Sequence, residues 1–172
     1  MFNTPYNFNY LGHTKTPTEP YNKLHKFAFK CRFNNRYIIR VEEYDYCMFV
    51  VKFSLKNHEQ SERKYQLLSG FNDVARVIAT NIEVMFWLLN KNDISSFGFV
   101  GANSENEEVA MSKRFKVYSK IMLRCFSPKY FSHRRSSSNS AYLLLNNKHL
   151  ETEENLEQTI KELFIKYYDM SL

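Results

Sequence analysis

The stretch from His25 to Phe33 reads His-Lys-Phe-Ala-Phe-Lys-Cys-Arg-Phe, and it decides the fold class of this chain. Apolar and basic side chains alternate along it, with Phe27, Phe29, Cys31 and Phe33 at one set of positions and Lys26, Lys30 and Arg32 at the other. Successive side chains of a β-strand point to opposite faces of a sheet. This period of two therefore predicts a strand that buries one of its faces.

The residues that follow predict two more strands. Asn34-Asn35 has the composition of a tight turn, and Tyr44-Asp45 separates residues 36–43 from residues 47–54. Both of these segments are rich in the β-branched and aromatic residues that favour strands. Because the connections are short, we expect the three strands to lie side by side as an antiparallel meander.

Three helices are predicted downstream, where apolar residues recur at spacings of three and four. They cover residues 74–90, 111–126 and 153–168. Pro128 ends the second, and the first turn of the third contains Glu153 and Glu154. Further strands are expected at 95–101 and 141–145, with a weak one at 64–68. If the strands at 95–101 and 141–145 are parallel, we expect a right-handed crossover between them.

These elements predict an α+β fold, in which the antiparallel N-terminal meander extends into a mixed sheet and three helices lie mostly on one face. Residues 1–24 contain three of the four prolines of the chain, Pro5, Pro17 and Pro20. We expect them to form an extended N-terminal arm ahead of one α+β domain at 25–172.

Composition limits the function classes. The chain has 172 residues, three cysteines at wide spacing and no apolar N-terminal segment of the secretory type, which predicts a cytoplasmic protein. No apolar run approaches the roughly 18 residues that a membrane span needs. No histidine is spaced with another histidine or a cysteine as metal ligands are, so we expect no metal and no cofactor. Catalytic motifs of known spacing are also lacking.

Charge is distributed unevenly. The net charge is +6, yet the 42 residues from Val109 to Leu150 contain no Asp or Glu and nine basic residues, so they carry +9 and the remaining residues −3. On a helix, Lys113, Lys116, Lys120 and Arg124 would share one face, with Arg114 beside them. Lys129, Arg134 and Arg135 are expected on the loop that follows, with the aromatic residues Tyr130 and Phe131.

Such a segment suits an anionic partner. Lysine and arginine neutralise phosphates, and exposed aromatic rings stack on the bases of single-stranded nucleic acid. A nucleotide or a phosphorylated partner would use the same groups. The alternative is that the lysines only solvate an exposed helix face and that the aromatic rings belong to the core. Both interpretations stay open from the sequence.

A second segment, Ser96-Phe97-Gly98-Phe99-Val100-Gly101-Ala102-Asn103-Ser104, places two glycines at a strand end. Backbone amides there could form an anion-binding turn. The spacing fits neither a Walker loop nor a dinucleotide fingerprint. We favour a packing role, in which Gly98 allows a helix to approach closely and Gly101 supplies a turn with positive φ.

Several strings in this region resemble a family of small uncharacterised bacterial proteins. They are Ser96-Phe97-Gly98-Phe99 with Gly101-Ala102-Asn103, Lys113-Arg114-Phe115 with Val117-Tyr118, and Asn139-Ser140-Ala141-Tyr142-Leu143-Leu144. The resemblance implies a cytosolic α+β protein and supplies no activity. It also suggests where a pocket would lie if these strings converge, formed by Asn103, Ser104, Lys113, Arg114, Tyr118 and Asn139.

The sequence thus predicts a basic binding module for an anionic partner, with nucleic acid ahead of a nucleotide and no catalytic role. The residues expected to contact the anionic partner are Lys113, Arg114, Lys116, Lys120, Arg124, Arg134 and Arg135. One alternative is a protein-interaction subunit, or a homodimer, of a bacterial toxin–antitoxin or phage-defence system. Another is an enzyme that acts on phosphate esters.

Overall fold

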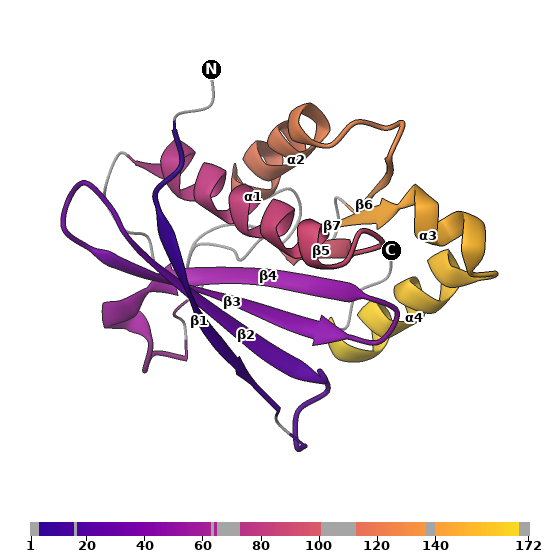
Figure 1. The fold of residues 1–172 in the computed structure, drawn as a ribbon, viewed down its shortest axis with the longest axis horizontal. Coiled ribbons are helices and arrows are strands. Elements are labelled where there is room, and N and C mark those ends of the chain that lie inside the picture. Colours follow the sequence, from indigo (N-terminus) through magenta and orange to yellow (C-terminus); the bar gives the residue numbers. More distant parts are fainter. Residues whose placement is uncertain are drawn as a thin grey trace.

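A computed structural model describes residues 4–15, 17–62, 64, 73–100, 113–136 and 140–168, of which positions 113 and 114 are described by their backbone alone. Seven strands form one sheet in the order β1-β2-β3-β4-β5-β7-β6 (Figure 1). The strands are β1 (Phe8–Thr14), β2 (Lys23–Lys30), β3 (Arg36–Tyr44), β4 (Met48–Leu55), β5 (Ser96–Val100), β6 (Phe131–Ser136) and β7 (Ala141–Asn146). The helices are η1 (Lys56–His58), α1 (Val74–Lys91), α2 (Lys113–Cys125), α3 (Asn147–Thr152) and α4 (Leu156–Tyr168).

The predicted meander is confirmed, and the predicted α+β class with it. Strands β2, β3 and β4 pair antiparallel, with Phe27 opposite Ile39 and Ile39 opposite Phe53. Asn34 in the connecting turn adopts a φ of 66°, a conformation that asparagine tolerates better than most residues. Strand β4 then pairs parallel with β5, and β7 pairs antiparallel with both β5 and β6.

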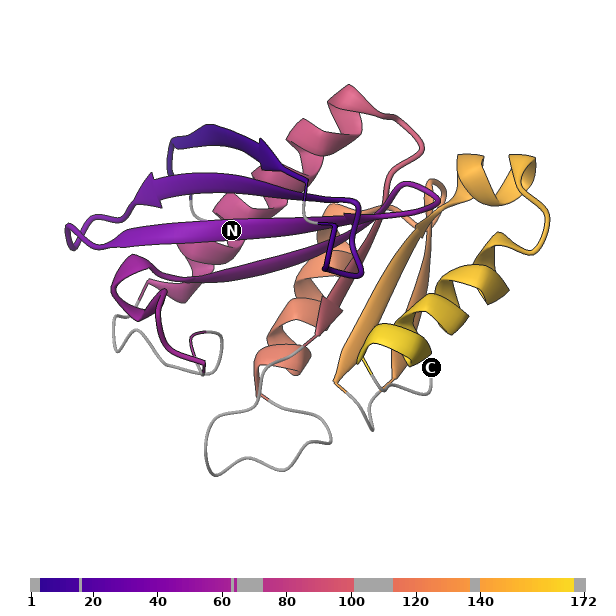
Figure 2. The same cartoon turned by 90° about the horizontal axis from the view of Figure 1, so that it is seen from below.

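The sheet buries side chains on both faces. Face A carries Phe27, Ile39, Phe49, Phe97 and Tyr142 and forms one core with α1 and α2. Face B, the opposite face, packs Met48, Val50, Leu143 and Leu145 against α4. Two of the three main helices therefore share a face. Figure 2 shows α4 beside the β7–β6 end of the sheet, away from β1.

Part of the predicted arm belongs to the sheet. Residues 8–14 form the edge strand β1, and its register with β2 shifts between Tyr10 and Gly12. This bulge interrupts the alternation that would have indicated a strand. Just before β1, the Tyr6 hydroxyl donates a 2.5 Å hydrogen bond to Asp73, the residue preceding α1. The N-terminal residues are thereby attached to the start of α1.

Three predictions in the second half of the chain were wrong in detail. The loop expected around Arg134 and Arg135 is strand β6, because its backbone pairs with β7 although its side chains are polar. Strands β5 and β7 are antiparallel, so there is no parallel crossover between them. The last helix begins at Leu156 and not at residue 153, and residues 147–152 form the separate helix α3. Of the weak strand at 64–68, only Lys64 is described, and it lies in a turn.

Gly98 lets α4 approach β5. A Cβ atom added at this position would lie 2.2 Å from Cζ of Phe164 and 2.8 Å from Cε of Met48. The predicted packing role of Gly98 is confirmed, whereas Gly101 lies outside the described residues. Among the described helices, none has the length and apolar content needed to cross a membrane.

Replacing Gly98 by alanine should lower the free energy of unfolding by about 1–3 kcal/mol, the usual cost of overpacking a core. Phe164→Leu removes part of the ring that the new methyl group would contact. This substitution should therefore lower the free energy of unfolding by less in the Gly98→Ala background than in the wild type. Urea denaturation of the two single variants and the double variant measures this coupling. If the effects of the two substitutions on the free energy of unfolding are strictly additive, Gly98 does not determine the distance between β5 and α4.

Candidate functional site

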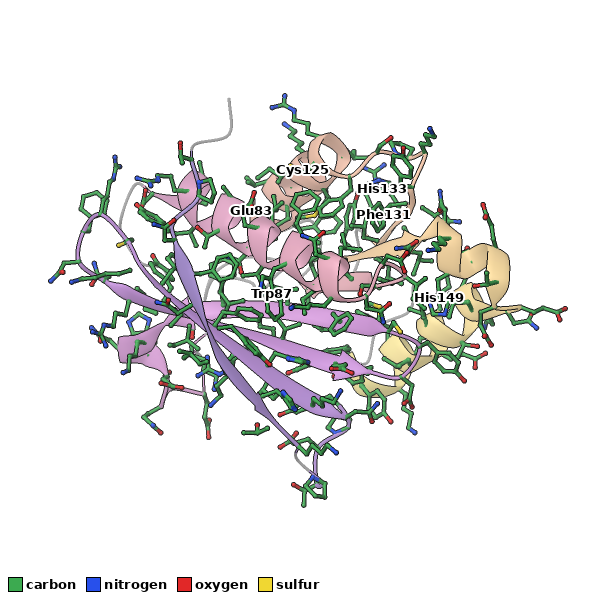
Figure 3. The ribbon with its side chains drawn as sticks, in the orientation of Figure 1. Glu83, Trp87, Cys125, Phe131, His133 and His149 are labelled. Carbon is green, nitrogen blue, oxygen red and sulfur yellow. The ribbon has the colours of Figure 1, made fainter. Side chains whose placement is uncertain are left out.

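Helix α2 has one buried and one basic side. Phe115, Ile121 and Met122 are buried in the face A core. Lys116, Lys120 and Arg124 are exposed and follow one another at intervals of four residues, so they form a row along the helix. Long side chains that end in nitrogen project outward from α2 in Figure 3. Lys113 and Arg114 begin the helix, but their side chains are outside the described part.

The basic character continues beyond α2. Lys129 and Tyr130 are exposed, and Nζ of Lys129 lies 5.2 Å from the centroid of the Tyr130 ring. Arg135 is exposed on β6 and pairs in register with Tyr142, a face A residue, so it lies on the same face of the sheet as α2. Phe131 belongs to the core, because it is buried with its ring 5.2 Å from that of Phe126.

We call Lys116, Lys120, Arg124, Lys129 and Arg135 the basic surface. Within the described part of the chain, none of them forms an ion pair with a carboxylate. Lys148, by contrast, pairs with Asp93. The excess positive charge predicted for this segment is therefore concentrated on the α2 side of the molecule.

Arg134 lies elsewhere. It alternates with Arg135 along β6, so its side chain is on face B, where it meets α4. Its Nε and Nη2 atoms donate to the two carboxylate oxygens of Glu157 at 2.7 and 2.9 Å. This bidentate pair holds the pKa of Glu157 at about 2 and raises the pKa of Arg134. Arg134 thus lies on a different face from the other residues predicted to bind the anionic partner, and the carboxylate of Glu157 neutralises its charge.

The predicted pocket is described at one position only. Tyr118 lies on the core side of α2, with its ring centroid 6.4 Å from those of Phe53 and Phe99. Asn103, Ser104 and Asn139 lie outside the described residues. The pocket therefore remains a prediction.

His133 fixes the end of α2 to the sheet. Its Nε2–H donates to the carbonyl oxygen of Phe126 at 2.9 Å, and its Nδ1 accepts from the Tyr142 hydroxyl at 2.5 Å. Burial, together with the charges of Arg135 and Arg134, lowers the pKa of His133 and favours this neutral form. Figure 3 labels His133 and Phe131, which both come from β6, and Cys125 at the end of α2.

A second polar cluster on face A was not predicted, because its members are far apart in the sequence. Glu43 accepts from Nε2 of His25 at 2.6 Å, and the Tyr10 hydroxyl lies 3.0 Å from Nδ1 of His25 and 3.2 Å from Nδ1 of His13. The Tyr10 hydroxyl therefore links the exposed His13 to His25, and His25 links it to Glu43. In the described residues, no group of three His, Cys, Asp or Glu side chains could hold a metal ion.

The Arg134–Glu157 pair should make stability depend on pH. Because the pKa of Glu157 is depressed to about 2 in the folded state, the pair stabilises the fold above pH 4.5, and this contribution disappears as the pH falls toward 2. We expect Glu157→Gln to cost about 1 kcal/mol at pH 7, since the pair is partly exposed and screened by solvent. Denaturation of both proteins between pH 2 and pH 7 measures the difference.

The control for this experiment is Glu154→Gln, which removes an exposed carboxylate just before α4. It should leave the pH profile of stability close to that of the wild type. A Glu157→Gln deficit that is as large at pH 2 as at pH 7 would contradict the predicted role of the ion pair.

Neither a scan against protein-family models nor searches of curated proteins and of solved structures find a match to this chain. The resemblance to small bacterial proteins therefore rests on the quoted strings alone.

Proposed function

We propose that this protein binds single-stranded nucleic acid through the basic surface. The observation that supports the proposal best is the contrast between paired and unpaired cations in the acid-free segment. Arg134 and Lys148 have carboxylate partners, whereas the five residues of the basic surface have none among the described residues. The unpaired cations lie on the α2 side, as a phosphate backbone that follows α2 would require.

The helical row suits a polyanion. Like charges four residues apart on a helix repel each other by roughly 0.2–0.5 kcal/mol per pair, and an anion along the row removes this repulsion. Phosphates that replace their condensed counterions with lysine and arginine release those ions, which favours binding. Tyr130 adds an exposed ring beside Lys129 on which a base could stack. In this proposal the protein binds without catalysing a reaction.

A second candidate partner is an acidic protein, such as the other subunit of a bacterial toxin–antitoxin or phage-defence system. Val117 and Leu123 are exposed among the basic residues of α2. Apolar side chains of this kind suit a protein interface better than a phosphate backbone. If the protein has no affinity for nucleic acid at low salt, this candidate takes the place of the first.

The test of nucleic-acid binding is a triple variant, Lys116→Gln/Lys120→Gln/Arg124→Gln. Its affinity for a fluorescent single-stranded RNA should fall at least tenfold. The slope of log affinity against log salt should become shallower by about 2, since each phosphate contact to a single strand contributes about 0.7. Fluorescence anisotropy across a salt series measures both quantities.

The matched control is Lys148→Gln/Lys161→Gln/Lys166→Gln, which removes the same charge from positions outside the basic surface. This variant should bind RNA within about threefold of the wild type, because net charge alone acts only at long range and is screened by salt. An equal loss in the two triple variants would reject the basic surface as the site. If the wild-type protein does not bind the RNA at low salt, the proposed function is wrong.

A further inference from the structure

The turn between α2 and β6 presents Tyr130 to solvent. This turn, residues 127–130, follows the end of α2 and stops where Phe131 begins β6. The Tyr130 side chain belongs to a residue that is 58% exposed, whereas Phe131 is buried with its ring against that of Phe126. Tyr130 thus lies outside the face A core, and much of its surface is open to a ligand.

Hydrogen bonds within the turn restrict its backbone. The amides of Tyr130 and Phe131 both donate to the carbonyl oxygen of Ser127, at 2.9 and 3.0 Å. The amide of Lys129 donates to the Ser127 hydroxyl at 3.3 Å. Pro128 occupies the second position of this turn, where its ring fixes φ at the value that the turn requires.

Asn147 holds the same turn from outside it. Its Nδ2 donates to the carbonyl oxygens of Pro128 at 3.1 Å and Lys129 at 3.2 Å, and its backbone amide donates to that of Tyr130 at 2.9 Å. The Ser132 hydroxyl donates to Oδ1 of Asn147 at 2.8 Å, which sets the orientation of the side-chain amide. The backbone that carries Tyr130 is therefore held at three successive carbonyl oxygens by one residue.

A turn held in this way suits a contact with a ligand. An aromatic side chain on a fixed backbone loses less conformational entropy on binding than one on a mobile loop. Nζ of Lys129 already lies 5.2 Å from the centroid of the Tyr130 ring. Since the base and the phosphate of a nucleotide are adjacent, a base stacked on Tyr130 would bring a phosphate within reach of Lys129.

We propose that Tyr130 is the base-stacking residue of this protein and that Asn147 is the positioning residue that holds it in place. The inference rests on the proposed function and divides it between two parts of the molecule. The row of Lys116, Lys120 and Arg124 binds the phosphates of any strand. Tyr130 contacts an unpaired base, and because every base has a face that can stack, it accepts bases of any sequence.

The test compares a fluorescent DNA single strand with a strand of the same length in which every nucleotide is abasic. Both strands carry the same phosphates, and only the first has bases. The wild type should bind the first at least about fivefold more tightly, because stacking one base on an aromatic ring contributes that factor or more. Fluorescence anisotropy across a salt series measures both affinities.

Tyr130→Leu should abolish this preference for the strand with bases. The slope of log affinity against log salt should stay as in the wild type, since no phosphate contact is removed. Tyr130→Phe should keep the preference, because it retains the ring. The matched control is Tyr46→Leu, which removes an exposed tyrosine from the turn between β3 and β4, and it should also keep the preference.

The two parts of the proposed site should respond separately. The Lys116→Gln/Lys120→Gln/Arg124→Gln variant should bind both strands more weakly and keep the ratio of the two affinities. If the wild type binds the two strands equally, or if Tyr130→Leu keeps the preference, the stacking role is wrong and the proposed function stands. If the wild type binds neither strand at low salt, the proposed function is wrong, and this inference with it.

The positioning role is tested with Asn147→Ala, which removes two donors to the turn. This variant should reduce the preference for the strand with bases at least about twofold without changing the salt slope. In the Tyr130→Leu background, the same substitution should have little further effect on either affinity, because Asn147 acts through Tyr130. If Asn147→Ala weakens the binding of both strands alike, or acts as strongly in the Tyr130→Leu background, Asn147 has only a structural role.

Discussion

The hydrogen-bonded register of β2, β3 and β4 is the constraint on which most of this structure depends. It brings Phe27 opposite Ile39 and Ile39 opposite Phe53, and so it creates the apolar surface on which α1 and α2 pack. The same register determines which side chains of β2, β3 and β4 lie on face B. A slip of one residue would exchange the two faces, and Lys26, Arg40 and Lys52 would lie in the core.

The second half of the chain extends this sheet and covers its reverse side. β5 joins β4 in parallel, and β7 and β6 complete the sheet. The α4 helix then packs on face B beside Gly98, where the missing side chain leaves room for Phe164. Arg134 and the basic surface consequently lie on different faces of the sheet, with Arg134 paired to Glu157 of α4 on face B.

Much of the architecture was predictable because its signals are local. The period of two in 25–33 and the spacing of apolar residues in 74–90 were sufficient for a strand and a helix that the structure confirms. Strand β6 was missed because its sequence, Phe-Ser-His-Arg-Arg-Ser, has no apolar alternation, and its pairing with β7 supplies the structure.

The candidate sites were less predictable, because they depend on which distant residues meet. Arg134 and Arg135 are adjacent in the sequence, yet one pairs with Glu157 and the other is exposed on the opposite face. Asn147 meets the turn that carries Tyr130 only because β6 and β7 pair. The same is true of His13, His25 and Glu43, which no spacing in the sequence connects.

The two edges of the sheet have a consequence for the behaviour of the protein in concentrated solution. An open edge strand is a template for strands of neighbouring molecules, and such pairing leads to aggregation. At one edge, the bulge between Tyr10 and Gly12 interrupts the regular backbone of β1. At the other, β6 carries the exposed Arg135, whose charge repels the same residue on a second copy of the strand. Arg135 therefore helps to keep individual molecules apart, whatever the protein binds.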